Sequence, residues 1–260
     1  MDADHPVLHL MYHRVTNGPS AHPYTVTASR FEEHLRVAAS AEQDPTRFFR
    51  PVFTFDDGHS SNYGQASSLL TKYGHAGLFF VTAGWIETRP DFMCWSEVKQ
   101  LYANGHAVGC HGLTHKLLTC CSEAELYREL TVSKELLERK VGTSVDAISM
   151  PGGRWDVRVL SACARAGYRR VFTSDPGTRI EVRQGLQVIP RVNSSLYDRP
   201  EELRRLLTVN SSALSRLRVK QGVKKSIRRV LGDRLYHRLW CVVLGWRDHR
   251  EAAADLIRSE

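Results

Sequence analysis

The sequence predicts an α/β protein, a distorted (β/α) barrel of about seven strands with a basic helical C-terminal extension. Short apolar runs rich in β-branched and aromatic residues alternate with amphipathic stretches, which is the pattern of a parallel sheet covered by helices. Polar residues follow the ends of five of these runs, the position that carries the active site in α/β barrels. Beyond residue 200 the alternation ends and basic charge accumulates. A doubly wound open sheet is the alternative that the same alternation permits.

The predicted strands are short runs bounded by turn residues, and the predicted helices lie between them. The strands span residues 7–12, 52–55, 77–82, 106–110, 145–150, 168–173 and 187–189. The helices end at glycines, which favour the left-handed conformation that closes a helix. They span residues 62–73, 96–104, 122–141 and 156–166. Ser122 and Glu125 have the spacing of a capping box at the start of the third helix.

Charge divides the chain into two parts. Residues 1–200 hold 22 Lys and Arg against 21 Asp and Glu, whereas residues 201–250 hold 13 against 4. We therefore expect a nearly neutral barrel domain over residues 1–200 and a basic helical extension over 201–260. A nucleic-acid partner is not expected, because no stacking or groove-reading module accompanies the charge.

The basic segment, residues 214–246, interleaves Arg and Lys with aliphatic side chains. It is interpreted either as a helical cap packed on the barrel or as an amphipathic helix that binds an anionic membrane surface. No run reaches the roughly 20 apolar residues that span a bilayer. Since the N-terminus shows no basic and apolar leader, we expect a cytoplasmic protein, peripheral on the inner face of the membrane if the segment binds lipid. The six cysteines, without Cys-x-x-Cys spacing, are expected to be reduced.

Polar side chains follow five of the predicted strands. Because the carboxyl ends of parallel strands meet at one rim of a barrel, we expect these residues to converge on one pocket. This convergence carries more weight than any single motif. The residues are His13, Asp56 with Asp57, His111, the turn Pro151-Gly152-Gly153, and Arg191.

Two adjacent carboxylates and a pair of histidines form the strongest candidate site. Asp56 and Asp57 follow an apolar strand, where two buried acids are costly without a cation. His111 and His115 are spaced i, i+4 and share a face if the segment turns helically. Each motif alone has a plainer interpretation, a solvated Asp-Asp-Gly turn or a chance histidine pair. Together an Asp-His-His set suits a divalent metal ion with open coordination positions, and Zn²⁺ suits it best.

At these residues the sequence resembles the polysaccharide deacetylases of carbohydrate esterase family four, which share the NodB homology domain. Residues 54–58 match the family's first motif, 111–115 match the second, and 149–153 occupy the third. The resemblance covers about residues 7–195. The N-terminal Tyr12-His13-Arg14-Val15 segment is similar to a subclass in which the strand with the acid histidine opens the chain. The family's fold is a distorted β/α barrel, which agrees with the predicted pattern.

The resemblance implies a role for each motif residue. Asp57, His111 and His115 are expected to be the metal ligands and Asp56 the general base. The backbone N–H of Gly152 is expected to stabilise the oxyanion. For the acid that protonates the departing amine, the commonest C-terminal histidine motif is absent, so His13 is the candidate. The plainer interpretation of His13 is a buried strand-end histidine with a satisfied tautomer.

The third motif departs from the family's commonest pattern. Ser149 stands where many members have an arginine that holds the catalytic aspartate. Arg154 or Arg191 would supply that cation here, and Arg191 is the better placed because it follows a strand. Trp155 is interpreted either as a platform for the apolar face of a sugar or as the core anchor of the following helix.

These motifs predict a metal-dependent hydrolase. Its expected substrate is an N-acetylated glycan, and the reaction removes N-acetyl groups from amino sugars in an oligosaccharide, polysaccharide or lipid-linked glycan precursor and releases acetate. Two alternatives stay open. One is hydrolysis of another amide or ester bond on the same metal site, and the other is a glycan-binding barrel without catalysis.

Overall fold

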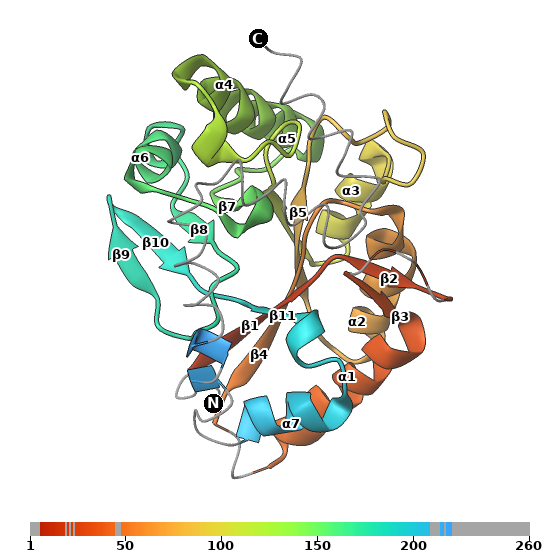
Figure 1. Ribbon diagram of the computed structural model, residues 1–260. Helices are drawn as coiled ribbons and strands as arrows, with labels where there is room; N and C mark the ends of the chain where they lie inside the picture. Colours follow the sequence, from red (N-terminus) through yellow and green to blue (C-terminus); the bar gives the residue numbers. More distant parts are fainter. Residues whose placement is uncertain are drawn as a thin grey trace.

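The fold is built around one curled nine-stranded sheet (Figure 1). This computed structural model describes residues 6–18, 20, 22, 24–44, 48–208, 214, 215 and 217–219. All seven predicted strands are present, each with bounds within two residues of those expected. They are β1 (Val7–Tyr12), β4 (Arg50–Phe55), β5 (Gly77–Val81), β6 (Ala107–Cys110), β7 (Ala147–Ser149), β8 (Arg170–Phe172) and β10 (Leu186–Ile189).

The strand order excludes the doubly wound alternative. The neighbours follow the sequence in the order β1-β4-β5-β6-β7-β8-β10, and every one of these pairs is parallel. A doubly wound sheet reverses direction at a switch point, and no reversal occurs in this run of strands. Each connection therefore advances the chain in the same direction around the sheet, as the predicted barrel requires.

A single segment brings the two ends of the sheet together. β10 pairs with β8 at one end, while β11 (Val192–Asn193) pairs with β1 at the other. Only Pro190 and Arg191 separate β10 from β11, so Ile189 and Val192 lie within about 11 Å of each other. The sheet is therefore a barrel that this one strand segment nearly closes, and Arg191 lies at the closure.

Four of the observed strands were not predicted from the sequence, which indicated about seven strands. β11 is one of them. β2 (Arg14–Thr16) and β3 (Thr25–Thr27) pair with each other as a separate two-stranded sheet. β9 (Glu181–Arg183) is an antiparallel edge strand whose three residues are all exposed. Strands this short, or without a buried face, carry no readable hydrophobic alternation.

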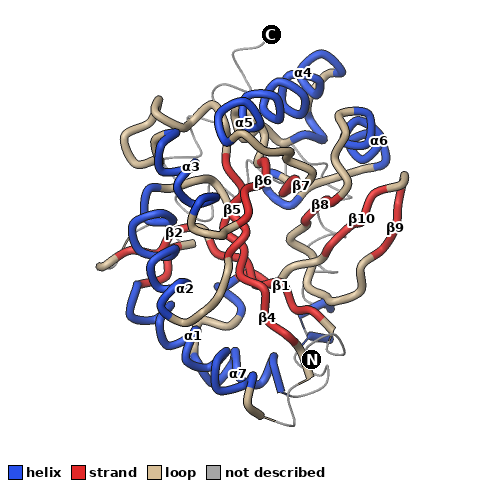
Figure 2. Tube along the Cα trace, turned by 180° about the vertical axis from the view of Figure 1, so that it is seen from behind, coloured by secondary structure: helices blue, strands red, loops and turns tan. Residues whose placement is uncertain are grey.

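Helices lie around the outside of the curled sheet (Figure 2). All four predicted helices are present, and the capping box at Ser122 and the left-handed Gly142 occur as expected. Two of them contain π-helical turns, at Asn62–Ser67 before α2 and at Arg128–Val132 between α4 and α5. The helices are α1 (Ala28–Glu42), which was not predicted, α2 (Ser68–Lys72), α3 (Trp95–Ala103), α4 (Glu123–Tyr127), α5 (Ser133–Val141), α6 (Val157–Arg165) and α7 (Pro200–Thr208).

Alternation along the strands gives the sheet two apolar faces. The larger core lies between the sheet and the helices and includes Leu10, Phe55 and Phe79. The smaller core fills the barrel interior, where the rings of Phe80 and Phe172 lie 4.9 Å apart between centroids. This inner core supports the polar residues at the rim. Its members are Leu78, Phe80, Ala147, Phe172 and Ile189.

The first part of the C-terminal extension packs on the barrel. α7 lies against α1 (Figure 1) and buries three leucines, Leu203, Leu206 and Leu207. Leu214 is buried as well, and Arg218 donates a hydrogen bond to the carbonyl oxygen of Pro176. The remainder of the basic segment, and with it the predicted membrane-binding surface, lies outside the described residues. Among the described residues, no helix combines the length and apolar character needed to cross a membrane.

Candidate active site

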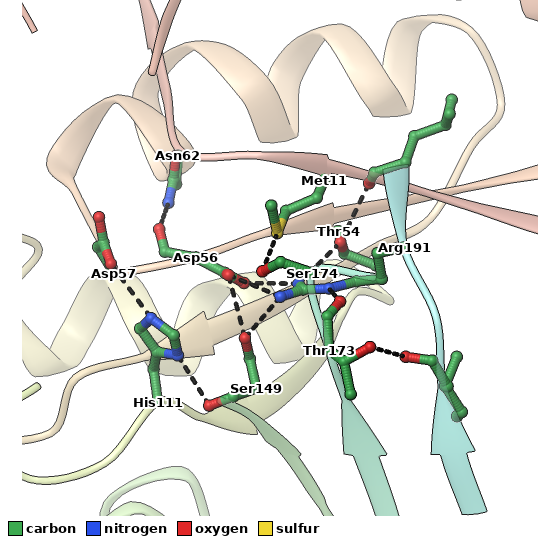
Figure 3. Close-up of polar contacts among 12 residues, drawn as sticks. Met11, Thr54, Asp56, Asp57, Asn62, His111, Ser149, Thr173, Ser174 and Arg191 are labelled. Carbon is green, nitrogen blue, oxygen red and sulfur yellow. Dashed lines mark hydrogen bonds and ion pairs between the residues drawn. The ribbon is translucent and has the colours of Figure 1, made fainter. Parts of the chain in front are cut away.

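Polar residues from separate strands meet at the carboxyl-terminal rim of the barrel (Figure 3). Asp56 and Asp57 follow β4, His111 follows β6, Ser149 ends β7, and Arg191 follows β10. Hydrogen bonds and ion pairs join these side chains into one network (Figure 3). The structure thus brings together residues that lie up to 135 positions apart in the sequence.

Backbone conformation separates the roles of the two adjacent aspartates. Successive side chains of a strand point to opposite faces, so regular continuation of β4 would turn Asp57 away from the barrel interior that Asp56 faces. Asp57 instead has a φ of 77°. This left-handed conformation is uncommon outside glycine and concentrates at functional sites. It redirects the Asp57 carboxylate toward the histidines at the rim.

Asp57, His111 and His115 form the cluster of metal-ligand type in the described part of the chain. The Nε2 atom of His111 lies 3.3 Å from Oδ1 of Asp57, and the Nε2 atom of His115 lies 3.5 Å from the same oxygen. All three ligand atoms lie within 4.8 Å of one another. The side chain of Trp85, which sequence reasoning missed, flanks this cluster with its ring centroid 5.1 Å from that of His115.

The hydrogen bond on the far side of His111 fixes its tautomer. Nδ1 of His111 lies 2.9 Å from the carbonyl oxygen of Ser149, which can only accept, so Nδ1 carries a proton. In the neutral ring Nε2 then presents a lone pair to Asp57. Such a backbone partner for the second ring nitrogen is typical of metal-bound histidine.

The donor set fits a small divalent cation. Zinc binds histidine nitrogen at about 2.0–2.1 Å and carboxylate oxygen at about 2.0–2.2 Å, so tetrahedral ligand atoms stand about 3.4 Å apart. The distances of 3.3 and 3.5 Å match this spacing. Oδ1 of Asp57 is buried and accepts no hydrogen bond from the described residues. A buried carboxylate oxygen that faces two imidazole nitrogens needs a proton or a cation between them.

Asp56 is held by a buried guanidinium. Nη1 of Arg191 lies 2.7 Å from Oδ1 of Asp56, and Nη2 lies 2.8 Å from Oδ2. The hydroxyl of Ser149 donates to Oδ2 at 3.0 Å. Arg191 is 0% exposed and Asp56 is 2% exposed. Of the two arginines that the sequence offered for this role, the one at the barrel closure makes the bidentate pair.

Both aspartates are ionised. Burial raises the pKa of Asp56, but the Arg191 guanidinium and then the His111 imidazole outweigh it, so that the pKa is lowered overall. Burial likewise raises the pKa of Asp57, yet the adjacent imidazole of His111 and then those of His13 and His115 hold it well below its usual range. The site therefore places two negative charges side by side, one buried on Asp56 and one largely buried on Asp57.

His13 lies at the same rim, after β1. Its ring stacks on Tyr24 with centroids 4.7 Å apart and an angle of 18° between the planes. Burial lowers the pKa of His13, while Asp57 and Asp56 act in the opposite direction, and the pKa is lowered overall. Nδ1 of His13 is buried and has no hydrogen-bond partner among the described residues. The plainer interpretation, a strand-end histidine with a satisfied tautomer, does not fit this nitrogen.

The remaining candidates lie on the segment after β7. Gly152 is exposed, with a φ of 61°, and an added Cβ would meet Leu117 at 2.7 Å. Arg154 is buried. Trp155 packs against the main core, and the guanidinium of Arg183 lies 5.7 Å from its ring centroid. These contacts favour the core-anchor interpretation of Trp155, and its role as a sugar platform stays a prediction.

Sequence reasoning assigned no supporting role to two hydroxyls and a carboxylate that support the site. Thr54 accepts a hydrogen bond from Arg191 at 3.2 Å, and Ser149 accepts one at 2.7 Å. Both are small polar residues at inward positions of buried strands, which is a readable signal. Glu129 is buried and bonded to the loop between the two histidines. Its signal was a glutamate on the apolar face of a predicted helix.

Comparison with known proteins points to one family. The family model described as polysaccharide deacetylase matches residues 44–171. A protein of Bacillus subtilis named as a polysaccharide deacetylase is 26% identical over 201 residues, which cover 72% of this chain and 70% of the relative. A chitooligosaccharide deacetylase of Rhizobium leguminosarum bv. trifolii is 32% identical over 125 residues, which cover 47% of this chain and 56% of the relative. The chain thus spans about half the length of that deacetylase.

Solved structures share the fold. The deacetylase PplD of Streptococcus pyogenes, solved with acetate, aligns with a TM-score of 0.67 at 20% identity and covers 78% of this chain and 98% of its own. IcaB of Ammonifex degensii aligns with a TM-score of 0.62 at 22% identity and covers 77% and 97%. At these identities the likeness is one of fold alone.

Proposed function

Because this chain belongs to the polysaccharide deacetylase family, we propose that it removes N-acetyl groups from amino sugars of a glycan and releases acetate. Its substrate is an oligosaccharide, a polysaccharide or a lipid-linked glycan precursor. One observation carries the proposal: a fitting Asp-His-His ligand set lies beside a second aspartate that a buried arginine holds in place. A metal site next to an oriented carboxylate is what hydrolysis of an unactivated amide needs.

The proposed ligands are Asp57, His111 and His115, and Zn²⁺ is the ion that they suit best. When bound there, the ion supplies Lewis-acid chemistry: it lowers the pKa of water and polarises a carbonyl oxygen. The protein holds the ligands ready for it. The carbonyl of Ser149 orients His111, and the left-handed backbone of Asp57 aims its carboxylate.

Asp56 is the proposed general base. A carboxylate has about four acceptor positions, and Arg191 and Ser149 fill three of those on Asp56. The position left open is on Oδ1, and it accepts the proton of the attacking water. The guanidinium keeps the carboxylate ionised and fixes its direction. The lowered pKa of Asp56 makes it a weak base, which suits a water whose own pKa is lowered.

Two further groups complete the proposed reaction. The backbone N–H of Gly152 stabilises the oxyanion that develops on the acetamide. His13 in its imidazolium form donates a proton to the departing amine and becomes the neutral imidazole. Its ring lies at the same rim, where the charges of Asp57 and Asp56 favour the protonated form. The protonated amine leaves as the acetate is released.

An acetate-release assay tests the proposal. The purified protein is incubated with a panel of N-acetylated glycans, with and without a chelator, and acetate is measured. Release that the chelator abolishes is the expected result. Binding of a glycan without release would favour a carbohydrate-binding barrel, and turnover confined to other amides or esters would favour a different hydrolase.

Variants of single residues test the assignments. Asp56→Asn is expected to abolish turnover while the protein retains its metal, and His111→Ala is expected to lose the metal. Asp91→Asn, at an exposed carboxylate, is the control for charge removal and should change neither. Full activity in Asp56→Asn or His111→Ala would contradict the role assigned to that residue. An undiminished rate in His13→Ala would mean that another residue protonates the departing amine.

We further propose that the basic segment 214–246 binds anionic lipid and brings the enzyme to lipid-linked or membrane-synthesised glycans. The support is its composition of interleaved Arg, Lys and aliphatic residues. Because α7 packs on α1, the test uses a chain that ends at Val219. It should sediment with phosphatidylglycerol vesicles far less than the full chain does. Equal sedimentation of the two chains would contradict the proposal.

A further inference from the structure

The loop that carries the two histidines has an unusual backbone conformation. Gly112 has a φ of 81° and His115 a φ of 65°, both in the left-handed region. This conformation is uncommon for a residue other than glycine, and it persists where the surroundings stabilise it. Nε2 of His115 must nevertheless stay 3.5 Å from Oδ1 of Asp57 for the ligand set to exist. A restraint from outside the loop is therefore needed.

A buried carboxylate on the neighbouring helix supplies that restraint. Glu129 is 3% exposed. Its Oε2 atom accepts the backbone N–H of Leu113 at 2.8 Å and that of Thr114 at 3.0 Å. Its Oε1 atom accepts the hydroxyl of Thr114. Both carboxylate oxygens thus accept hydrogen bonds from the residues between the two histidines. These bonds are charge-assisted, and such bonds are roughly twice as strong as neutral ones.

The loop sequence is matched to this carboxylate. A Cβ placed on Gly112 would lie 2.9 Å from Oε2 of Glu129. Glycine at this position therefore serves two needs, the positive φ and the close approach of the carboxylate. The Glu129 carboxylate, which holds the loop, occupies the space that a side chain at position 112 would take.

The backbone beneath Glu129 is itself fixed. Glu129 belongs to the π-helical turn Arg128–Val132, and such turns are frequent at functional sites. The hydroxyl of Ser133 donates to the carbonyl oxygen of Glu129 and lies 3.1 Å from the thiol of Cys110. Cys110 is the last residue of β6, which leads directly into the ligand loop. The turn and the loop are thus tied to the same strand end.

We propose that Glu129 is a positioning residue that clamps the ligand loop and sets the place of His115 for metal binding. This inference rests on the proposed function, since it assumes that Asp57, His111 and His115 bind a divalent ion. Glu129 touches neither the metal ligands' donor atoms nor the reacting groups, so it acts through the backbone of the loop.

Zinc affinity tests the clamp. Competition with a chromophoric chelator is expected to show zinc binding about 10- to 100-fold weaker in Glu129→Ala than in the unaltered chain. Glu129→Gln should stay within a few-fold, because its amide oxygen still accepts two N–H groups and its amide nitrogen can donate to Thr114. Glu135→Ala, an exposed glutamate on the same helix, is the matched control and should not change the affinity.

Hydrogen exchange of the metal-free protein separates the clamp from the metal site. The amides of Leu113 and Thr114 should exchange faster in Glu129→Ala than in the unaltered chain. If the unaltered chain binds no zinc, the proposed function fails while faster exchange still supports a clamp on the loop. If zinc binds and Glu129→Ala binds it with unchanged affinity, the clamp is overturned.

A milder variant keeps the test decisive if Glu129→Ala does not fold. Thr114→Val removes the bond to Oε1 and leaves both backbone bonds in place. It should weaken zinc binding by less than Glu129→Ala would, while Glu129→Gln leaves the affinity nearly unchanged. Equal zinc affinity in Thr114→Val, Glu129→Gln and the unaltered chain overturns the proposal.

Discussion

Replacement of Arg191 by methionine removes a guanidinium from the barrel interior and leaves an apolar side chain of similar length. All five N–H donors of Arg191 are used. Nε donates to the carbonyl oxygen of Thr173, and the remaining four reach Thr54, Ser149 and both oxygens of Asp56. The substitution therefore leaves the Asp56 carboxylate, which is 2% exposed, without its charged partner.

The structure sets the size of the effect. Removing one partner of a buried ion pair costs about 3–5 kcal/mol, because the other charge stays buried without compensation. That is a large part of the roughly 5–15 kcal/mol that stabilises a folded domain. It corresponds to a loss of about two to nearly four orders of magnitude in the ratio of folded to unfolded protein. Arg191→Lys should fall between, since an ammonium keeps the charge but not the planar fork.

Urea unfolding at pH 7 of the metal-free protein measures the effect. The control is Arg183→Met, whose pair with Glu181 is 52% and 46% exposed and should contribute less than about 1 kcal/mol. The double variant Arg191→Met with Asp56→Asn should be more stable than Arg191→Met alone, because no buried charge is left unpaired. If Arg191→Met loses no more stability than Arg183→Met, the argument from the buried pair is wrong.

Three further predictions concern the barrel interior. Burial, and then the nearby arginines, lower the pKa of His9 to about 4. An unfolded histidine titrates near 6.5, so the unfolded chain binds the extra proton between pH 6.5 and pH 4, and stability falls as the pH falls through this window. His9→Gln should remove about 3 kcal/mol of this loss, measured by urea unfolding at pH 7 and pH 4, and an unchanged pH dependence would refute the assignment. Gly109→Ala places a Cβ 2.5 Å from the Phe80 ring and should cost about 1–3 kcal/mol, whereas Gly64→Ala, with open space around it, should be neutral or stabilising. Ser149→Ala removes hydroxyl bonds within the Asp56 network and should cost about 1–3 kcal/mol in the same assay, and a neutral effect would contradict that network.

Local patterns predicted most of the fold and the three residues that cluster as candidate metal ligands. Hydrophobic periodicity predicts the strands and helices of ordinary length, and glycines mark the helix ends. Parallel topology then predicts that the carboxyl ends of the strands form one rim. The ligand set Asp57, His111 and His115 could be found because its members lie in two short motifs. β9 and β11 could not be found in this way, because one has no buried residue and the other is two residues long.

The partner of Asp56 could not be settled from the sequence, because it depends on long-range pairing. Arg191 is the favoured candidate because it comes closely after a predicted strand, but Arg154 also follows one by a few residues. What selects Arg191 is the break between β10 and β11, which joins the two ends of the sheet and turns this one side chain into the barrel. No local pattern encodes that closure. The same holds for Glu129, whose partners lie 15 and 16 residues away.

Charge balance explains why the two adjacent aspartates have different partners and different proposed roles. Each carries a negative charge that is buried or largely buried, and each needs its own cation. Arg191 matches the carboxylate of Asp56 with a bidentate contact and cannot serve Asp57 as well, since all five of its donors are used. Around Asp57 the described structure provides imidazoles, one of which is fixed with its lone pair toward the carboxylate. A divalent ion bound at this position would supply the missing charge. In the proposed function, the aspartate that the arginine reaches is the general base and the other is the metal ligand, so exchanging the two roles would require the barrel to close elsewhere.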